Sequence, residues 1–329
     1  MAHCIVRYVE ADRAGWGRLT GPAPTRAADA VEIVVIPTQA STTRDLIADL
    51  ERDPAISERG PRKTIVAAQL LSPVTTDATL VCQGLNYRDH AAEAGHHARK
   101  ENLFFTKASS SLCGPYADII KPARVELLDY EVEIGVVLRK AISRGVVVEP
   151  DEVGSYVAGV VLCNDVSARD VMFSASFFQW YQGKSYRTFC PAGPVLYHLE
   201  PSEVASVLDS LEIALRWNGA PRQAARTSDL IYKPAETLTQ LADIMDLGPG
   251  DMVLTGTPGG VIAQGTPKLI EVFRTHLLDD NSRRDAMRAE MKTLGPFLQM
   301  GDALTLTLRD LRSGLDLGGQ HCQIVDEVR

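Results

Sequence analysis

The chain has 329 residues, of which 45% are hydrophobic, so it can form one large domain or a large and a small one. Its 34 lysines and arginines stand against 42 aspartates and glutamates, giving a formal charge of −8 with no basic block. This balance argues against nucleic acid or an anionic membrane as a partner and favours small molecules or protein subunits.

The N-terminus and the cysteines indicate the compartment. The first residues lack the pattern of a secretory signal, and no apolar run approaches the roughly 18 residues of a membrane span. The six cysteines are scattered without a CxxC pair. We read them as reduced thiols and therefore expect a cytoplasmic protein.

Residues 1–75 predict a small leading α/β region. CIVRYVEA and VEIVVIP have the composition of strands, TTRDLIADLERD that of a short helix, and Ser72-Pro73 favours a break. From about Thr79 onward, short β-rich runs punctuated by glycine, proline, asparagine and aspartate dominate. This spacing is typical of a mostly antiparallel or mixed β-domain. We therefore predict a mainly β fold with some α structure (α+β) and a second domain over 76–329.

Residues 267–298 interrupt the β pattern. Apolar residues from Leu269 to Leu278 recur at helical spacing, and Asn281 is placed to cap a second helix. The segment lies between two candidate strands, so we interpret it as a helical insertion. It is either a surface excursion or subunit contact, or a lid over an active site.

The stretch LDYEVEIGVVL, residues 128–138, alternates apolar and acidic residues as in a half-buried strand. Glu131 and Glu133 share one side of it, where they face solvent or together bind one ion. Asp165 follows the apolar run VAGVVLCN, where an unpaired acid is costly. Three carboxylates on β structure, without neighbouring cysteine or histidine, suit Mg²⁺ or Mn²⁺ better than zinc.

A histidine in NYRDHAAEAG is a candidate general base. The segment predicts a short helix that Asn86 could cap and Gly95 could end. His90 and Glu93 are three residues apart and share a helical face, so the carboxylate can accept one ring proton and leave the other nitrogen basic. A surface histidine with a chance acidic neighbour is the alternative.

Six segments, in this order, resemble the fumarylacetoacetate hydrolase family: GLNYRDHAAEAG, LDYEVEIGVVL, NDVSARD, QWYQGKSYRTFCPAGP, NGAPRQAARTSDLIY and LGPGDMVLTGTPGGV. The resemblance extends over about residues 80–262 and resumes near Gly301 and Asp302. It implies a mixed β-roll catalytic domain and, usually, a homodimer. It also implies a divalent cation held by Glu131, Glu133 and Asp165.

The resemblance implies catalytic roles for three further side chains. His90 and Glu93 match a histidine and glutamate of related hydrolases and decarboxylases. Lys184 would place its ammonium against negative charge that develops on the substrate, unless it is an ordinary surface lysine. Met172 departs from the family pattern, because many relatives carry a glutamine there that touches substrate.

Two segments are expected to contact the substrate. By resemblance Arg169 would face the substrate or support the site, although an ion pair with Asp170 or Glu133 is an open alternative. The glycine-rich turn TGTPGG would hold the substrate carboxylate at Gly256 and Thr257, unless it is a plain tight turn.

These residues lead to a hypothesis about the reaction. The resemblance implies a metal-dependent enzyme for a small 2-oxo acid, and we favour hydrolysis of a C–C bond in a 2,4-dioxo acid of the acylpyruvate or fumarylpyruvate type, in the catabolism of aromatic or related compounds. Water deprotonated by His90 would attack C4, and metal and Lys184 would stabilise the departing enolate. Isomerisation of the 2-hydroxyhepta-2,4-diene-1,7-dioate type and 2-oxo acid decarboxylation are alternatives. A catalytically silent subunit that binds metal or dicarboxylate is an alternative of another class.

Overall fold

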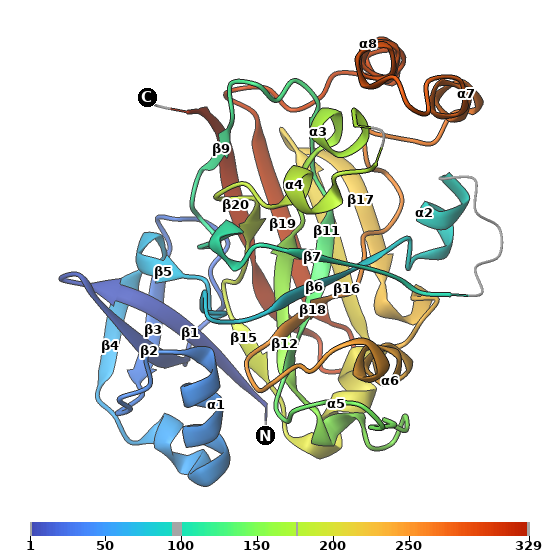
Figure 1. Ribbon diagram of the computed structural model, residues 1–329. Helices are drawn as coiled ribbons and strands as arrows, with labels where there is room; N and C mark the ends of the chain where they lie inside the picture. Colours follow the sequence, from blue (N-terminus) through green and yellow to red (C-terminus); the bar gives the residue numbers. More distant parts are fainter. Residues whose placement is uncertain (1, 94–100, 176, 328–329) are drawn as a thin grey trace.

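The computed structural model describes residues 2–93, 101–175 and 177–327 (Figure 1). Most strands belong to two sheets. The larger sheet has the order β4 (Arg62–Val66), β3 (Ala30–Val35), β2 (Arg13–Leu19), β1 (His3–Glu10), β15 (Leu196–His198), β12 (Val157–Asn164), β11 (Val132–Leu138), β18 (Met252–Leu254), β6 (Leu80–Gly84) and β7 (Leu103–Lys107), with β5 (Leu70–Leu71) paired to β1.

The second sheet has the order β17 (Ala220–Arg226), β16 (Leu211–Trp217), β19 (Ala303–Asp310), β20 (Leu315–Asp326) and β9 (Ile119–Lys121). Two small ladders join β10 (Leu128–Asp129) to β13 (Ser167–Ala168) and β14 (Cys190–Pro191) to β8 (Leu112–Cys113). Most pairs are antiparallel, while β18–β6, β20–β9 and β14–β8 are parallel. The expected mainly β fold of mixed strand direction is confirmed.

The described helices are short and lie around the sheets. They are α1 (Thr43–Arg52), α2 (Arg88–Glu93), α3 (Arg169–Phe173), α4 (Trp180–Lys184), α5 (Pro201–Leu208), α6 (Pro234–Ile244), α7 (Pro267–Thr275) and α8 (Asp280–Met291). None of them is long and apolar enough to cross a membrane.

The central strands β11 and β12 are buried on both faces. Ile134 and Val136 belong to the core between the two sheets, whereas Val137 and Cys163 pack in a second core with Leu46 of α1. The prediction of a half-buried strand was therefore wrong, because elements remote in sequence cover its second face. Acids at the ends of these strands consequently lie in the protein interior.

The leading region is continuous with the larger sheet. Strand β1 pairs with β2 and with β15, with His3 opposite His198. Hydrogen bonding thus connects the first 71 residues directly to the strands of the later part of the chain. The domain division near residue 75 stays a prediction.

Helices α7 and α8 form an excursion between β18 and β19, beside α3 (Figure 1). Thr266 caps α7 by accepting the N–H of Leu269 at 3.0 Å. The cap of α8 is Asp279, which accepts the N–H of Ser282 at 3.1 Å. The expected cap Asn281 was wrong, because it lies inside the first turn of the helix.

Candidate active site

Three carboxylates meet where β11 begins and β12 ends. Glu131 directly precedes β11, Glu133 is its second residue, and Asp165 directly follows β12. The backbone N–H of Asp165 donates to the carbonyl of Glu131 at 2.8 Å, so antiparallel pairing brings the three acids together. One oxygen from each lies within 4.8 Å of the others, and all three residues are buried. Such a set of oxygens fits a hard divalent cation.

Lys184, at the end of α4, bridges two of these acids. Its Nζ donates to Glu131 at 2.8 Å and to Asp165 at 2.5 Å. The lysine is buried, which excludes the surface-lysine alternative. Burial alone raises the pKa of Glu131, but Lys184 and Arg169 outweigh it and lower that pKa to about 2.

Arg169, the first residue of α3, is held by two carboxylates. Its Nη2 donates to Glu131 at 2.6 Å and its Nε to Asp129 at 2.9 Å. The alternative ion pairs with Asp170 or Glu133 were therefore wrong: the short β10–β13 ladder turns Asp129 toward the arginine. Arg169 also lines the cavity described below.

Lys107 is a site residue that the sequence did not reveal. This buried lysine ends β7 and donates to Asp165 and to the carbonyl of Phe189, which is 2.6 Å away. A lysine at the end of the apolar run LFF was the available signal, because such a lysine requires a buried anion. Lys107 thus pairs with one carboxylate oxygen of Asp165 and Lys184 with the other.

Glu133 differs from its neighbours in having no ion pair among the described residues. It accepts the backbone N–H of Gly256 at 2.9 Å. Burial and repulsion from Asp165 and Glu131 raise its pKa well above the ordinary value.

The net charge of the buried carboxylates and their cationic partners indicates whether a metal ion fits this site. Four carboxylates, counting Asp129, face three cationic side chains. Burial makes this excess negative charge costly unless a proton or a cation balances it. The donor set and the charge therefore both fit a bound divalent cation, with Glu131, Glu133 and Asp165 as its ligands.

The TGTPGG turn follows β18 and packs against these carboxylates. Gly256 has a φ of +90°, which favours glycine, and its N–H is bound to Glu133. Thr257 donates its hydroxyl to the carbonyl of Val132 at 3.1 Å and accepts from Gln223 at 2.8 Å. Of the two residues expected to hold the substrate carboxylate, Thr257 lines the cavity and Gly256 supports Glu133.

His90 and Glu93 lie together on α2. His90 Nδ1 is 3.7 Å from Glu93 Oε2, and both carboxylate oxygens accept the N–H of Gly260 at 3.2 Å. Interaction with His90 lowers the pKa of Glu93 against the opposing effect of burial, and Gly260 contributes to the lowering. The two side chains are thus near enough for an ion pair when the imidazole is protonated, but 3.7 Å is beyond hydrogen-bond distance, so the orienting role of Glu93 stays a prediction.

Asn86 does not cap α2. Its amide donates to the carbonyls of Tyr232 at 3.1 Å and Thr255 at 2.9 Å. The prediction was wrong because these distant segments, rather than the helix, satisfy the side chain. Asn86 joins the start of α2 to the turn after β18, and Gly95 lies outside the described residues.

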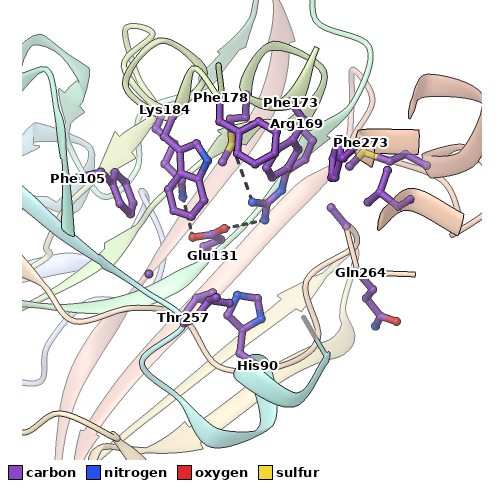
Figure 2. Close-up of a pocket in the computed structure, with 18 of the residues that line it drawn as sticks. His90, Phe105, Glu131, Arg169, Phe173, Phe178, Lys184, Thr257, Gln264 and Phe273 are labelled. Atoms are coloured by element: carbon purple, nitrogen blue, oxygen red, sulfur yellow. Dashed lines mark hydrogen bonds and ion pairs between the residues drawn. The ribbon is translucent and has the colours of Figure 1, made fainter. Parts of the chain in front are cut away.

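A cavity of about 440 Å³ is lined by four of these side chains, His90, Thr257, Glu131 and Lys184 (Figure 2). Figure 2 shows His90 and Thr257 across the cavity from Glu131 and Lys184. Met172, where a polar substrate contact was expected from the family, also lines it. The remaining lining residues are Gln83, Gly84, Leu85, Phe105, Arg169, Phe173, Phe178, Trp180, Ala263, Gln264, Gly265, Leu269, Ile270, Phe273 and Met291.

The fold and this cluster define a mixed β protein with a candidate oxygen-ligand metal centre at the edge of its central strands. Residues 79–314 match the model of the fumarylacetoacetate (FAA) hydrolase C-terminal family. The chain therefore belongs to the fumarylacetoacetate hydrolase family. Enzymes of this family include hydrolases, isomerases and tautomerases, and they use divalent metals.

Proteins of similar sequence include oxaloacetate tautomerases. The mitochondrial oxaloacetate tautomerase FAHD2A of Bos taurus is 39% identical over 193 residues, 58% of this chain and 59% of that protein. The human protein of the same name is 37% identical over the same shares. The match thus covers less than two thirds of these relatives.

Solved structures match over the whole chain. A probable 2-hydroxyhepta-2,4-diene-1,7-dioate isomerase from Mycobacterium abscessus has a TM-score of 0.72 at 26% identity and covers 100% of both chains. The fumarylacetoacetate hydrolase of Exiguobacterium antarcticum has a TM-score of 0.69 at 25% identity and covers 99% of this chain and 100% of its own. The expected fumarylacetoacetate-hydrolase-type β fold is confirmed.

Proposed function

We propose that this protein is a divalent-metal-dependent enzyme that hydrolyses a C–C bond in a 2,4-dioxo acid. One observation supports this proposal above others. His90, which has Glu93 3.7 Å away, lines the same cavity as Lys184 and Glu131, and Glu133 and Asp165 lie beside Glu131. A candidate base and a candidate stabiliser of negative charge thus face the same small volume.

The carboxylates of Glu131, Glu133 and Asp165 would hold Mg²⁺ or Mn²⁺. A divalent cation there would supply Lewis acidity toward the oxygens of a 2-oxo acid. Homodimerisation and a cytoplasmic location remain predictions, and the curated relatives named above are mitochondrial.

Residues of the protein would carry out the proton transfers and stabilise the charge that develops during hydrolysis. His90 accepts a proton from water, and Glu93 orients the imidazole and stabilises its charged form. The water attacks the C4 carbonyl, and the C3–C4 bond breaks with its electron pair passing to the 2-oxo fragment as an enolate. Lys184 places a positive charge beside that fragment, and pyruvate leaves after C3 takes up a proton.

Tautomerisation is the second candidate. Curated relatives at 37–39% identity are oxaloacetate tautomerases, and their reaction needs the same enolate and proton transfer but no attack by water. Isomerisation, suggested by the Mycobacterium abscessus relative, moves a proton in the same way. The two candidates differ in whether the substrate is cleaved.

An assay on metal-stripped protein separates them. The protein is treated with chelator, given back Mg²⁺ or Mn²⁺, and offered acetylpyruvate, fumarylpyruvate and enol-oxaloacetate. Enol absorbance and pyruvate release are followed together, with protein-free blanks for spontaneous ketonisation and decarboxylation.

Loss of the enol band with matching pyruvate from either acylpyruvate supports hydrolysis. Loss of the oxaloacetate enol band above the blank, without pyruvate, supports the tautomerase. Pyruvate from oxaloacetate indicates decarboxylation. A chain that binds metal and turns over none of these acids is a silent binder, and the proposal then fails.

A further inference from the structure

One end of the cavity is walled by three phenylalanines from different segments. Phe173 ends α3, Phe178 precedes α4, and Phe273 lies on α7. The rings contact one another, with centroids 5.3 Å apart for Phe173–Phe178, 5.8 Å for Phe173–Phe273 and 5.1 Å for Phe178–Phe273. Figure 2 shows the three rings beyond Arg169, on the side of the cavity away from Phe105.

The cationic side chains among the described lining residues are already engaged by acids. Arg169 is bound to Asp129 and Glu131, and Lys184 to Glu131 and Asp165. The aromatic wall itself carries no charge. A second carboxylate on the substrate would therefore lose its hydration there without gaining a cation, which is unfavourable.

The aromatic wall also has apolar surface available for a ligand. Phe178 is 48% exposed although its ring contacts two others. Met172, Leu269 and Met291, which line the same cavity, extend the apolar surface. An apolar group placed against the ring of Phe178 would remove its exposed surface from water, which is favourable. Met172, Leu269 and Met291 are almost fully buried and add apolar contacts.

We propose that this wall binds the acyl end of the substrate, and that the preferred substrate is a 2-oxo acid with a single carboxylate and an uncharged aromatic or bulky apolar group at its far end. The inference rests on the proposed function for the polar head of the substrate. It goes further by excluding distal diacids such as fumarylpyruvate as preferred substrates. Within the set of acylpyruvates it selects an aroylpyruvate.

A buried arginine holds two parts of the wall together. Arg283 of α8 is 1% exposed and donates to the carbonyls of Ala175 at 2.6 Å and His276 at 3.0 Å, and to Leu277. It thereby ties the α7–α8 connection to the segment after α3. Arg283 is a positioning residue, and the helical excursion contributes to the wall through α7.

Binding of unreactive head-group analogues tests the inference apart from turnover. N-ethyloxamate, N-benzyloxamate and N-oxalylglycine carry the same oxalyl head with a small, an aromatic and a carboxylate tail. Their dissociation constants are measured by calorimetry on Mn²⁺-loaded protein. Burial of a phenyl group predicts that N-benzyloxamate binds about 10- to 100-fold more tightly than N-ethyloxamate, with N-oxalylglycine the weakest.

Matched variants locate the effect. Phe178→Ala and Phe273→Ala are expected to reduce the benzyl-to-ethyl preference to a few-fold while leaving N-ethyloxamate affinity within about threefold. Phe177→Ala is the control, because Phe177 is 79% exposed and does not line the cavity. Thermal unfolding of each variant verifies that it is folded. If Phe273→Ala does not fold, Phe178→Ala, whose side chain is half-exposed, still tests the inference.

The outcomes distinguish this inference from the proposed function. Equal affinity for the ethyl and benzyl analogues, or tightest binding of N-oxalylglycine, overturns this inference. Either result leaves the proposed function unaffected, because the oxalyl group still binds. Failure of all three to bind in the presence of Mn²⁺ overturns the proposed function as well. A higher kcat/KM for benzoylpyruvate than for acetylpyruvate and fumarylpyruvate is the supporting kinetic result.

Discussion

Both carboxylate oxygens of Glu131 accept hydrogen bonds from cationic side chains, whereas Glu133, two residues along the chain, accepts only a backbone N–H among the described contacts. Oxygens of the two glutamates lie within 4.8 Å of each other at the start of β11, yet Glu131 is paired with two cations and Glu133 with none among the described residues. Glu131 is stabilised as an anion, and Glu133 is the acid whose charge most needs a bound cation. The difference leads to the first prediction.

Glu133→Gln should weaken Mn²⁺ binding by at least about 10- to 100-fold, because a neutral amide replaces the carboxylate least compensated by the protein. Glu131→Gln should abolish metal-dependent activity. Calorimetric titration with Mn²⁺ measures the affinity, and Glu126→Gln, at a half-exposed acid outside the cluster, is the control. Unchanged Mn²⁺ affinity in Glu133→Gln would remove Glu133 from the ligand set.

His90→Ala should retain Mn²⁺ affinity and lose turnover by about 10²- to 10⁴-fold, the usual contribution of a positioned general base. Glu93→Gln should lose less, because the imidazole remains in the cavity. The measurements are kcat with the best substrate and Mn²⁺ titration of the same preparations. A fully active His90→Ala protein would refute the assignment of the base.

Lys107→Met should lower the free energy of unfolding by about 3–5 kcal/mol, because Asp165 then keeps a buried charge with one partner fewer. Urea unfolding at neutral pH in the presence of chelator measures it. The control is Lys292→Met, which removes an exposed ion pair with Glu126 and should change stability by at most about 1 kcal/mol. Equal effects of the two substitutions would show that the Lys107 pair does not stabilise the fold.

Asp310→Asn should lower the free energy of unfolding by about 1–3 kcal/mol at pH 7. Asp310 is buried at the end of β19 and accepts hydrogen bonds from Ser210 at 2.9 Å, Arg312 N–H at 3.0 Å and Ser313 at 2.7 Å. Burial raises the pKa of Asp310, but the hydroxyls of Ser313 and Ser210 and the Arg312 N–H lower it more.

The sign of the pH dependence follows from this lowered pKa. The carboxylate contributes its stabilisation above the ordinary aspartate pKa of about 3.9 and loses it as the pH falls through the lower folded value. The stability difference between wild type and Asp310→Asn should be the same at pH 7 and pH 5 and shrink below about pH 4. Urea unfolding across this range tests it, and a difference that narrows already between pH 7 and pH 5 would contradict the lowered pKa.

The sequence by itself determined the mainly β fold, the family and the types of side chain that meet in the cavity. Alternation and turn residues are local signals, so strands such as β11 and β12 could be placed from the residues alone. The spacing of Glu131 and Glu133 likewise put both acids on one side of the chain. His90 and Glu93 could be paired for the same reason, because both lie within one turn of helix.

Only the tertiary structure decided which charges pair and which faces are buried. Lys107, Arg169 and Asp129 reach the acids through strand pairings that join segments far apart in sequence, and local patterns carry no record of them. The same holds for the aromatic wall, to which α3 and α7 contribute residues about a hundred positions apart. Periodicity in the sequence specifies each helix and strand, whereas long-range packing in a dense interior decides which side chains contact one another. The sequence therefore predicted many of the side chains of the site, but not how they are arranged.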